Sequence, residues 1–151
     1  VLTANGDNAD YTPFAKHYHG VRVYLNDGEN HFVEAVFYPL NGAYKALPVD
    51  FDADGDLDIA AISFFPDYEK APEESFVYLE NEGDMAFVAW TFLAATDARW
   101  LTMDAGDIDG DGDEDIVLGA FVRGASNVPP ALEKRWQREA TSILILRNKH
   151  F

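Results

Sequence analysis

D-F-D-A-D-G-D-L-D, residues Asp50–Asp58, returns as D-I-D-G-D-G-D-E-D at Asp107–Asp115. Each copy places aspartate at positions 1, 3, 5, 7 and 9, and each has glycine at position 6. Carboxylates packed so densely repel one another, so a folded chain needs a counter-charge at these stretches. A hard divalent cation supplies it, since calcium takes about six to eight oxygen ligands.

The spacing of the acids suggests how one cation would be held in each copy. Carboxylates on alternate residues of a tight loop can converge on a single ion, and Gly55 and Gly112 sit where the loop turns, with an expected positive φ. We expect position 7 to contribute its backbone carbonyl. The candidate metal ligands are Asp50, Asp52, Asp54, Asp56 and Asp58 in the first loop, and Asp107, Asp109, Asp111, Asp113 and Asp115 in the second.

Two other interpretations compete with this one. The EF-hand loop begins in the same way but needs a glutamate at position 12, where this chain has Ala61 and Leu118. Apolar residues alternate with acids around the first loop and a β-branched run follows the second, which indicates flanking strands rather than helices. A solvated acidic loop that binds nothing is the remaining alternative, although such loops do not normally repeat glycine and carboxylates at fixed offsets.

The rest of the chain predicts short antiparallel strands in a repeated order. Val21–Leu25 and Phe32–Tyr38 flank a hairpin turn, and Phe76–Leu79 and Phe87–Leu93 repeat that arrangement. A short helical insertion is expected near residues 129–139, with prolines in its first turn. The expected units are a partial blade at 1–20, repeats at 21–75 and 76–141, and the first strand of a next blade at 142–151.

The acidic loops and the apolar strands that follow them resemble a known family. D-x-D-x-D-G-x-x-D followed by an apolar strand is similar to the FG-GAP repeat, also called the VCBS repeat, which builds β-propeller blades in integrin α-subunits and in secreted bacterial proteins. Leu118-Gly119-Ala120-Phe121 is close to the family's Phe-Gly and Gly-Ala-Pro signatures, whereas Ala61-Ile62-Ser63-Phe64 lacks the glycine. The resemblance implies an all-β fold of about two and a half four-stranded antiparallel blades, which would be either a segment of a larger propeller or an incomplete propeller that partners complete.

Composition narrows the possible partners. The hydrophobic fraction is 48%, which is typical of a globular chain, and the formal net charge is −16, which makes nucleic acid and anionic membranes poor partners. The sequence shows no membrane span and no signal peptide, so we expect a mature or internal piece. The chain has no cysteine, which leaves the redox compartment open.

Several other candidates are weaker. Asn5–Asp10 is a polar turn that could hold a third ion or simply cap a hairpin. His17 and His19 could form a metal pair, but a surface loop is the favoured interpretation. His31 and Asp104 have no identifiable partner in the sequence. The basic cluster Lys134, Arg135 and Arg138 is either a helix face neutralised by nearby carboxylates or a docking element for an acidic neighbour.

These observations favour a calcium-stabilised, non-catalytic β-propeller module that binds a protein or glycan partner, or the remaining blades of a propeller. About two structural calcium ions are expected, and weak sites of this kind need extracellular calcium, which predicts an extracytoplasmic location. The alternatives are a scaffold subunit of a large extracytoplasmic complex and an accessory domain of a larger enzyme. No nucleophile elbow, zinc-protease motif, P-loop or cysteine nucleophile supports catalysis by this chain.

Overall fold

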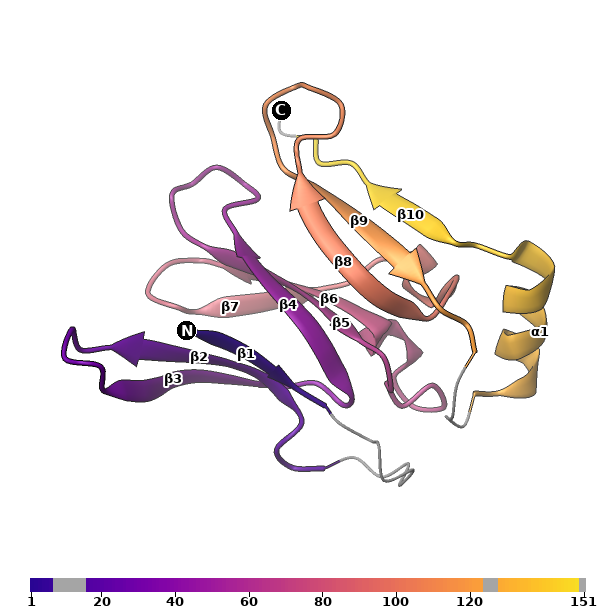
Figure 1. Cartoon of the computed structure of the whole chain (residues 1–151), viewed down its shortest axis with the longest axis horizontal. Coiled ribbons are helices and arrows are strands. Elements are labelled where there is room, and N and C mark those ends of the chain that lie inside the picture. Colours follow the sequence, from indigo (N-terminus) through magenta and orange to yellow (C-terminus); the bar gives the residue numbers. More distant parts are fainter. Residues whose placement is uncertain (7–15, 124–127, 150–151) are drawn as a thin grey trace.

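The computed structural model describes residues 1–6, 16–123 and 128–149. Within these ranges the strands form three antiparallel sheets side by side, and none closes into a barrel (Figure 1). The N-terminal sheet has the order β1 (Leu2–Asn5), β2 (Gly20–Asn26), β3 (Phe32–Pro39). The central sheet has the order β4 (Ala43–Val49), β5 (Asp58–Ser63), β6 (Phe76–Asn81), β7 (Phe87–Trp90). The C-terminal sheet consists of β8 (Trp100–Gly106), β9 (Asp115–Ala120) and β10 (Ile143–Leu146), with β9 in the middle.

The central sheet is covered on both faces, and β5 shows why. Every residue of β5 is buried, and successive side chains of a strand point to opposite faces. Ile59 and Ala61 belong to the core shared with the N-terminal sheet, while Ala60 and Ile62 belong to the core shared with the C-terminal sheet. A strand buried on both faces is expected to be continuously apolar, as the run Ile59–Ile62 is.

Two short 3-10 turns and one α-helix complete the described residues. The turns are η1 (Pro72–Ser75) and η2 (Leu93–Thr96), and the helix is α1 (Pro130–Glu139). Trp136 of α1 is almost fully buried, its ring packs edge-on against Tyr68, and its Nε1–H donates to the Thr96 carbonyl at 2.9 Å. Arg135 adds an ion pair with Asp97 at 3.0 Å. The helix therefore docks on the chain's own η2 turn. No helix in the described ranges is both long enough and apolar enough to cross a membrane.

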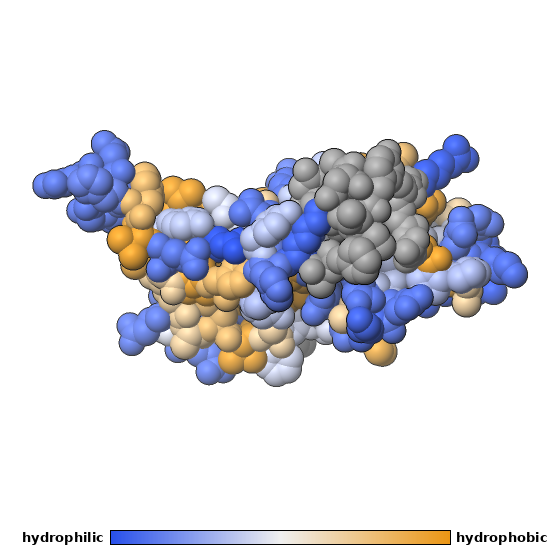
Figure 2. All heavy atoms as spheres, turned by 90° about the horizontal axis from the view of Figure 1, so that it is seen from below, coloured by the Kyte–Doolittle hydropathy of each residue, from blue (hydrophilic) through white to orange (hydrophobic). Residues whose placement is uncertain are grey.

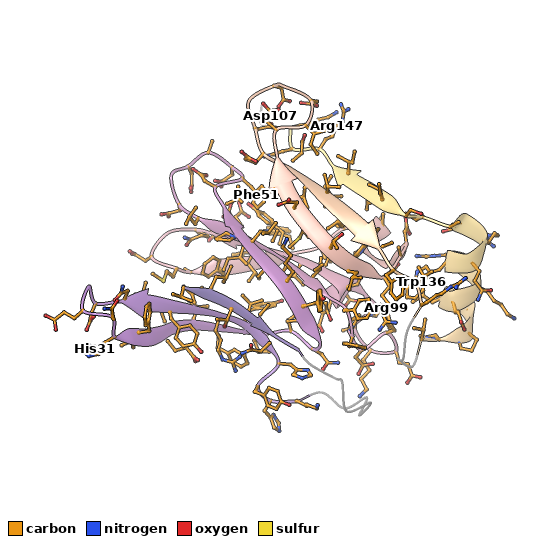
Figure 3. All side chains as sticks on the ribbon, viewed as in Figure 1. His31, Phe51, Arg99, Asp107, Trp136 and Arg147 are labelled. Atoms are coloured by element: carbon orange, nitrogen blue, oxygen red, sulfur yellow. The ribbon has the colours of Figure 1, made fainter. Side chains whose placement is uncertain are left out.

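Arg99 is an unusual part of this packing, because it is a fully buried cation next to aromatic rings (Figure 3). Its guanidinium carbon lies 3.7 Å from the centroid of the Phe64 ring, and its Nε–H donates to the Phe64 carbonyl at 2.9 Å. Burial lowers the pKa of Arg99 relative to its ordinary value. Attraction to the ring faces offsets part of the cost of burying the charge.

The expected all-β class is confirmed, with antiparallel sheets of three or four strands that are consistent with partial propeller blades. The helical insertion expected near 129–139 is α1. The sheets span residues 2–39, 43–90 and 100–146. Their boundaries therefore fall at different strands from those of the sequence repeats expected at 21–75 and 76–141. A sequence repeat and a sheet need not begin at the same strand, so the repeat bounds remain a prediction.

Apolar side chains are exposed on the outer sheets. At the hairpin of β2 and β3, Leu25, Phe32 and Val33 are exposed by 48%, 48% and 67%, and orange atoms gather beside that hairpin in Figure 2. On β10, Ile143 and Ile145 are also exposed. The two outer sheets therefore leave apolar surface uncovered within the described residues, as expected of blades without further neighbours.

Candidate metal centre

Each acidic stretch forms the loop of a β-hairpin. The first loop joins β4 to β5, where Val49 pairs with Asp58, and the second joins β8 to β9, where Gly106 pairs with Asp115. The two loops project from the same end of the central and C-terminal sheets (Figure 1). The strand periodicity around the motifs therefore predicted the flanking elements correctly, and the EF-hand alternative is wrong because no helix flanks either loop.

Three carboxylates converge in each loop. Asp50, Asp52 and Asp54 each offer a carboxylate oxygen within 4.8 Å of the others. The corresponding residues of the second loop, Asp107, Asp109 and Asp111, meet the same criterion. Positions 1, 3 and 5 of the motif are thus brought together in both copies, as the alternate spacing predicts.

Both loops share a frame of backbone hydrogen bonds. The N–H of position 6 donates to the carboxylate of position 1 at 3.1 Å, from Gly55 to Asp50 and from Gly112 to Asp107. The N–H of position 7 donates to the carboxylate of position 5, at 2.8 Å in the first loop and 3.3 Å in the second. These bonds hold Asp56 and Asp113 next to the cluster through their backbone, and their expected role as carbonyl ligands remains a prediction.

The turn depends on two left-handed residues in each loop. Gly55 and Gly112 have φ values of 97° and 99°, which confirms the expectation for position 6. Position 4 is left-handed as well, with φ of 60° at Ala53 and 82° at Gly110. The second loop therefore has glycine where the first accepts the strain of a Cβ atom.

Asp58 and Asp115, at position 9, are fully buried at the base of their loops. Asp58 accepts hydrogen bonds from the N–H of Phe51 at 3.1 Å, the N–H of Asn81 at 2.8 Å and the Tyr78 hydroxyl at 2.7 Å. Asp115 accepts from the backbone N–H groups of Ile108 at 3.1 Å and Asn148 at 2.9 Å. The two position-9 carboxylates thus tie each loop to the neighbouring strand, and they are not among the three converging acids.

Sequence reasoning missed the residues that bind these two carboxylates. Asn81 ends β6 and Asn148 follows β10, the strands paired with β5 and β9. The Asn148 side chain also donates from Nδ2 to the carbonyl of Phe51, which joins the two loops. The signal was present in the sequence, since Asn26, Asn81 and Asn148 recur after equivalent apolar strands.

Electrostatics at the loops reflects the crowding of the acids. Partial burial, together with the charges of Asp58, Asp54 and Asp50, raises the pKa of Asp52. Burial and the neighbouring Asp111 likewise raise the pKa of Asp109, whereas the N–H of Asp113 lowers the pKa of Asp111. Repulsion between neighbouring acids is thus a secondary cause of the raised pKa values of Asp52 and Asp109, and a bound cation would relieve it.

The donor set fits a hard cation. All candidate ligands are oxygens, and Asp50 Oδ1 is buried without a hydrogen-bond partner among the described residues. Oxygen-only sites suit calcium, magnesium or manganese and not the softer metals. The chemistry available here is electrostatic cross-linking of a turn.

Two weaker candidates need correction, and one is not described. His19 was expected in a surface loop, but it is buried and its Nδ1 lies 3.1 Å from Asn41 Oδ1. His31 does have a partner, because its Nδ1 lies 2.9 Å from Asp27 Oδ2 within the β2–β3 turn. Of the possible third site at Asn5–Asp10, residues 7–10 lie outside the described residues.

Two residues of the basic cluster of α1 form ion pairs with carboxylates of the same chain. Arg135 pairs with Asp97, and Arg138 pairs with Glu139 at 2.8 Å. This arrangement matches the interpretation of a helix face balanced by nearby carboxylates.

Comparison with known families gives a match that covers both loops. Residues 50–118 match the model of a family described as FG-GAP-like repeat. The match covers a little under half of the chain and is consistent with a repeat of the FG-GAP or VCBS type. The matched segment begins at the first residue of the first loop and ends inside β9, so it includes both acidic loops. No curated protein and no solved structure matched the chain. An FG-GAP repeat suggests a β-propeller-like interaction module.

Proposed function

We propose that this chain is a calcium-stabilised, non-catalytic interaction module in which each acidic loop holds one calcium ion. The observation that carries the proposal is the recurrence of one frame in two loops, each presenting three carboxylates within 4.8 Å. Such clusters are costly without a counter-ion, and a frame that repeats in detail indicates a common ligand. Calcium is favoured over magnesium because a loop that offers many carboxylate oxygens suits its larger and less regular coordination shell.

The role of the ion in this proposal is structural. Bound calcium would cross-link positions 1, 3 and 5 and so hold the hairpin between the first two strands of a blade. Because the loop carboxylates repel one another when no ion is bound, binding free energy adds to folding stability. Asp58 and Asp115 would contribute from the base of the loop through lone pairs that their hydrogen bonds leave unused.

Location and partner follow from the same chemistry. Loops of this kind bind calcium weakly in extracellular modules, at about 0.1–1 mM, which supports an extracytoplasmic protein. The FG-GAP-like repeat supports a role in recognising a protein or glycan, and the net charge of −16 argues against nucleic acid. The proposed calcium sites account for the clustered acids of both loops, so these acids give no separate support for a catalytic role.

The proposal is tested by calorimetric titration with calcium, combined with thermal melts in calcium and in chelator. We expect about two ions per chain, with Asp54→Ala and Asp111→Ala each removing one of them. Glu29→Ala is the matched control, since it deletes an exposed carboxylate in the β2–β3 turn, away from both loops. Unchanged stoichiometry in both loop variants, or equal melting temperatures with and without calcium, would contradict the proposal.

The recognition role needs a separate measurement. Glycan arrays and affinity capture from an extracellular protein extract, each run in calcium and in chelator, would distinguish the two partner classes. Binding that depends on calcium is expected for one of them. Binding to neither class under either condition would count against the interaction module.

A further inference from the structure

Arg147 forms an ion pair with one of the two acidic loops. This residue follows β10 and lies beside the loop that contains Asp107 (Figure 3). Its Nη1 lies 3.1 Å from Oδ2 of Asp109, the position-3 acid of the second loop. The Arg147 side chain is 60% exposed and that of Asp109 is 24% exposed. The more exposed guanidinium therefore forms an ion pair with one carboxylate of the converging cluster.

The first loop offers an internal comparison, because the two hairpins and their third strands have the same register. Leu79 pairs with Ile59 on the central sheet, and Leu146 pairs with Ile116 on the C-terminal sheet. The next residue along is Glu80 in one sheet and Arg147 in the other. The charge at this position is therefore reversed between the two repeats, and Glu80 Oε2 accepts a hydrogen bond from Trp90 Nε1 at 2.7 Å.

Both side chains line one hollow of about 350 Å³ between the central and C-terminal sheets. Its acidic lining comprises Asp52, Glu80 and Glu114, and Arg147 supplies the positive charge. Glu80 thus adds negative potential on the side of the first loop, where Asp52 is a candidate ligand. The positive charge of Arg147 instead pairs with Asp109 of the second loop.

The two loops also differ in how firmly they are anchored. At position 2 the first loop has Phe51, which is buried and packs edge-on against Tyr78. The second loop has Ile108 at this position, and Ile108 is 46% exposed. The first loop is therefore better held in shape before any ion arrives, which reduces the entropy lost on binding.

We propose that Arg147 is a built-in competitor for the cation at the second loop, an inference that rests on the cation binding proposed above. Without the cation, its guanidinium neutralises Asp109 and stabilises the second loop. With the cation, Asp109 must exchange this partner for the ion. The second loop consequently binds calcium more weakly than the first, and the module fills its sites in a fixed order as calcium rises.

Site-resolved calcium titration of the intact chain by 1H–15N NMR tests this assignment. The amides of Gly55 and Gly112 report separately on the two loops, since each donates to the position-1 carboxylate of its own loop. In the unaltered chain the Gly55 signal should reach its midpoint at lower calcium than the Gly112 signal. In Arg147→Gln the Gly112 midpoint should fall about fivefold, the upper range for an exposed ion pair, with a much smaller change at Gly55.

Two controls separate competition from a general effect. Arg138→Gln removes the same charge from the exposed face of α1 and should leave both midpoints unchanged. In chelator, Arg147→Gln should lower the melting temperature while it raises calcium affinity at the second loop. A residue with a merely structural role would lower both, so these opposite signs identify the competitor.

Three results would overturn the proposal. An unchanged Gly112 midpoint in Arg147→Gln would show that Arg147 does not compete, and equal shifts at both glycines would show only a change in overall charge. In either case calcium binding itself would still stand. Failure of both glycine signals to respond to calcium in the unaltered chain would instead refute the proposed cation sites, and the role of Arg147 with them.

Discussion

Replacing Asp58 with alanine should destabilise the protein even when no calcium is present. The side chain is fully buried and accepts hydrogen bonds from the buried N–H groups of Phe51 and Asn81. Each buried donor left without an acceptor costs about 1–3 kcal/mol, so the two together cost about 4 kcal/mol. The Tyr78 hydroxyl faces a partly open hollow and can turn to water, so it adds little.

The comparison with Asp54→Ala makes this prediction specific. Asp54 is an exposed member of the converging acids, and it accepts one exposed N–H bond from Asp56. Its removal in chelator loses that bond but relieves repulsion, so we expect a change within about 0.5 kcal/mol. In calcium Asp54→Ala should be more destabilising than it is in chelator, because it then also loses the stabilisation that the ion provides.

Thermal melts of both variants, in chelator and in calcium, provide the assay. At about 2–4 °C per kcal/mol for a chain of this size, Asp58→Ala should lower the melting temperature by roughly 10 °C in chelator. Asp58→Asn keeps one acceptor oxygen and should fall between Asp58→Ala and the unaltered chain, so it covers the case in which the alanine variant does not fold. Equal melting temperatures for Asp58→Ala and the unaltered chain in chelator would refute the structural role assigned to this carboxylate.

Three further predictions concern turn strain, loop coupling and pH. Ala53→Gly should stabilise and Gly110→Ala destabilise the chain in chelator melts, each by up to about 1 kcal/mol, since both positions have left-handed φ and differ only in a Cβ atom; changes of the same sign would contradict this. Asn148→Ala should make calcium binding to the two loops more independent in the NMR titration, because the Asn148 side chain donates to the first loop and its N–H donates to the second. Lys149→Ala is the neighbouring control and should leave the coupling between the loops intact. Burial, with lesser contributions from nearby acids, raises the pKa of Glu74, so the stability of the fold should decrease as pH rises above 4.5, the ordinary pKa of a glutamate. Glu74→Gln should therefore melt at a higher temperature than the unaltered chain at neutral pH but not at pH 4. Equal melting temperatures at neutral pH would contradict the destabilising role of the Glu74 charge.

The sequence by itself determined the strands, the hairpin loops and the convergence of the first three acids in each loop. These features depend on neighbours a few residues apart. Alternating apolar residues indicate a strand, Gly55 and Gly112 permit the left-handed turn, and the carboxylates at positions 1, 3 and 5 of such a turn are close enough in sequence to converge. The same local information predicted α1 from prolines followed by helix-forming residues.

Only the tertiary structure decided what lies behind and beside those loops. Asp58 and Asp115 looked equivalent to the other acids in the sequence, yet they are buried because β6 and the residues after β10 bring Asn81 and Asn148 to them. Arg147 reaches Asp109 from far along the chain. Contacts of this kind depend on strand register and on the way neighbouring sheets pack, and both are set by the burial of whole faces such as that of β5 rather than by any local pattern of residues.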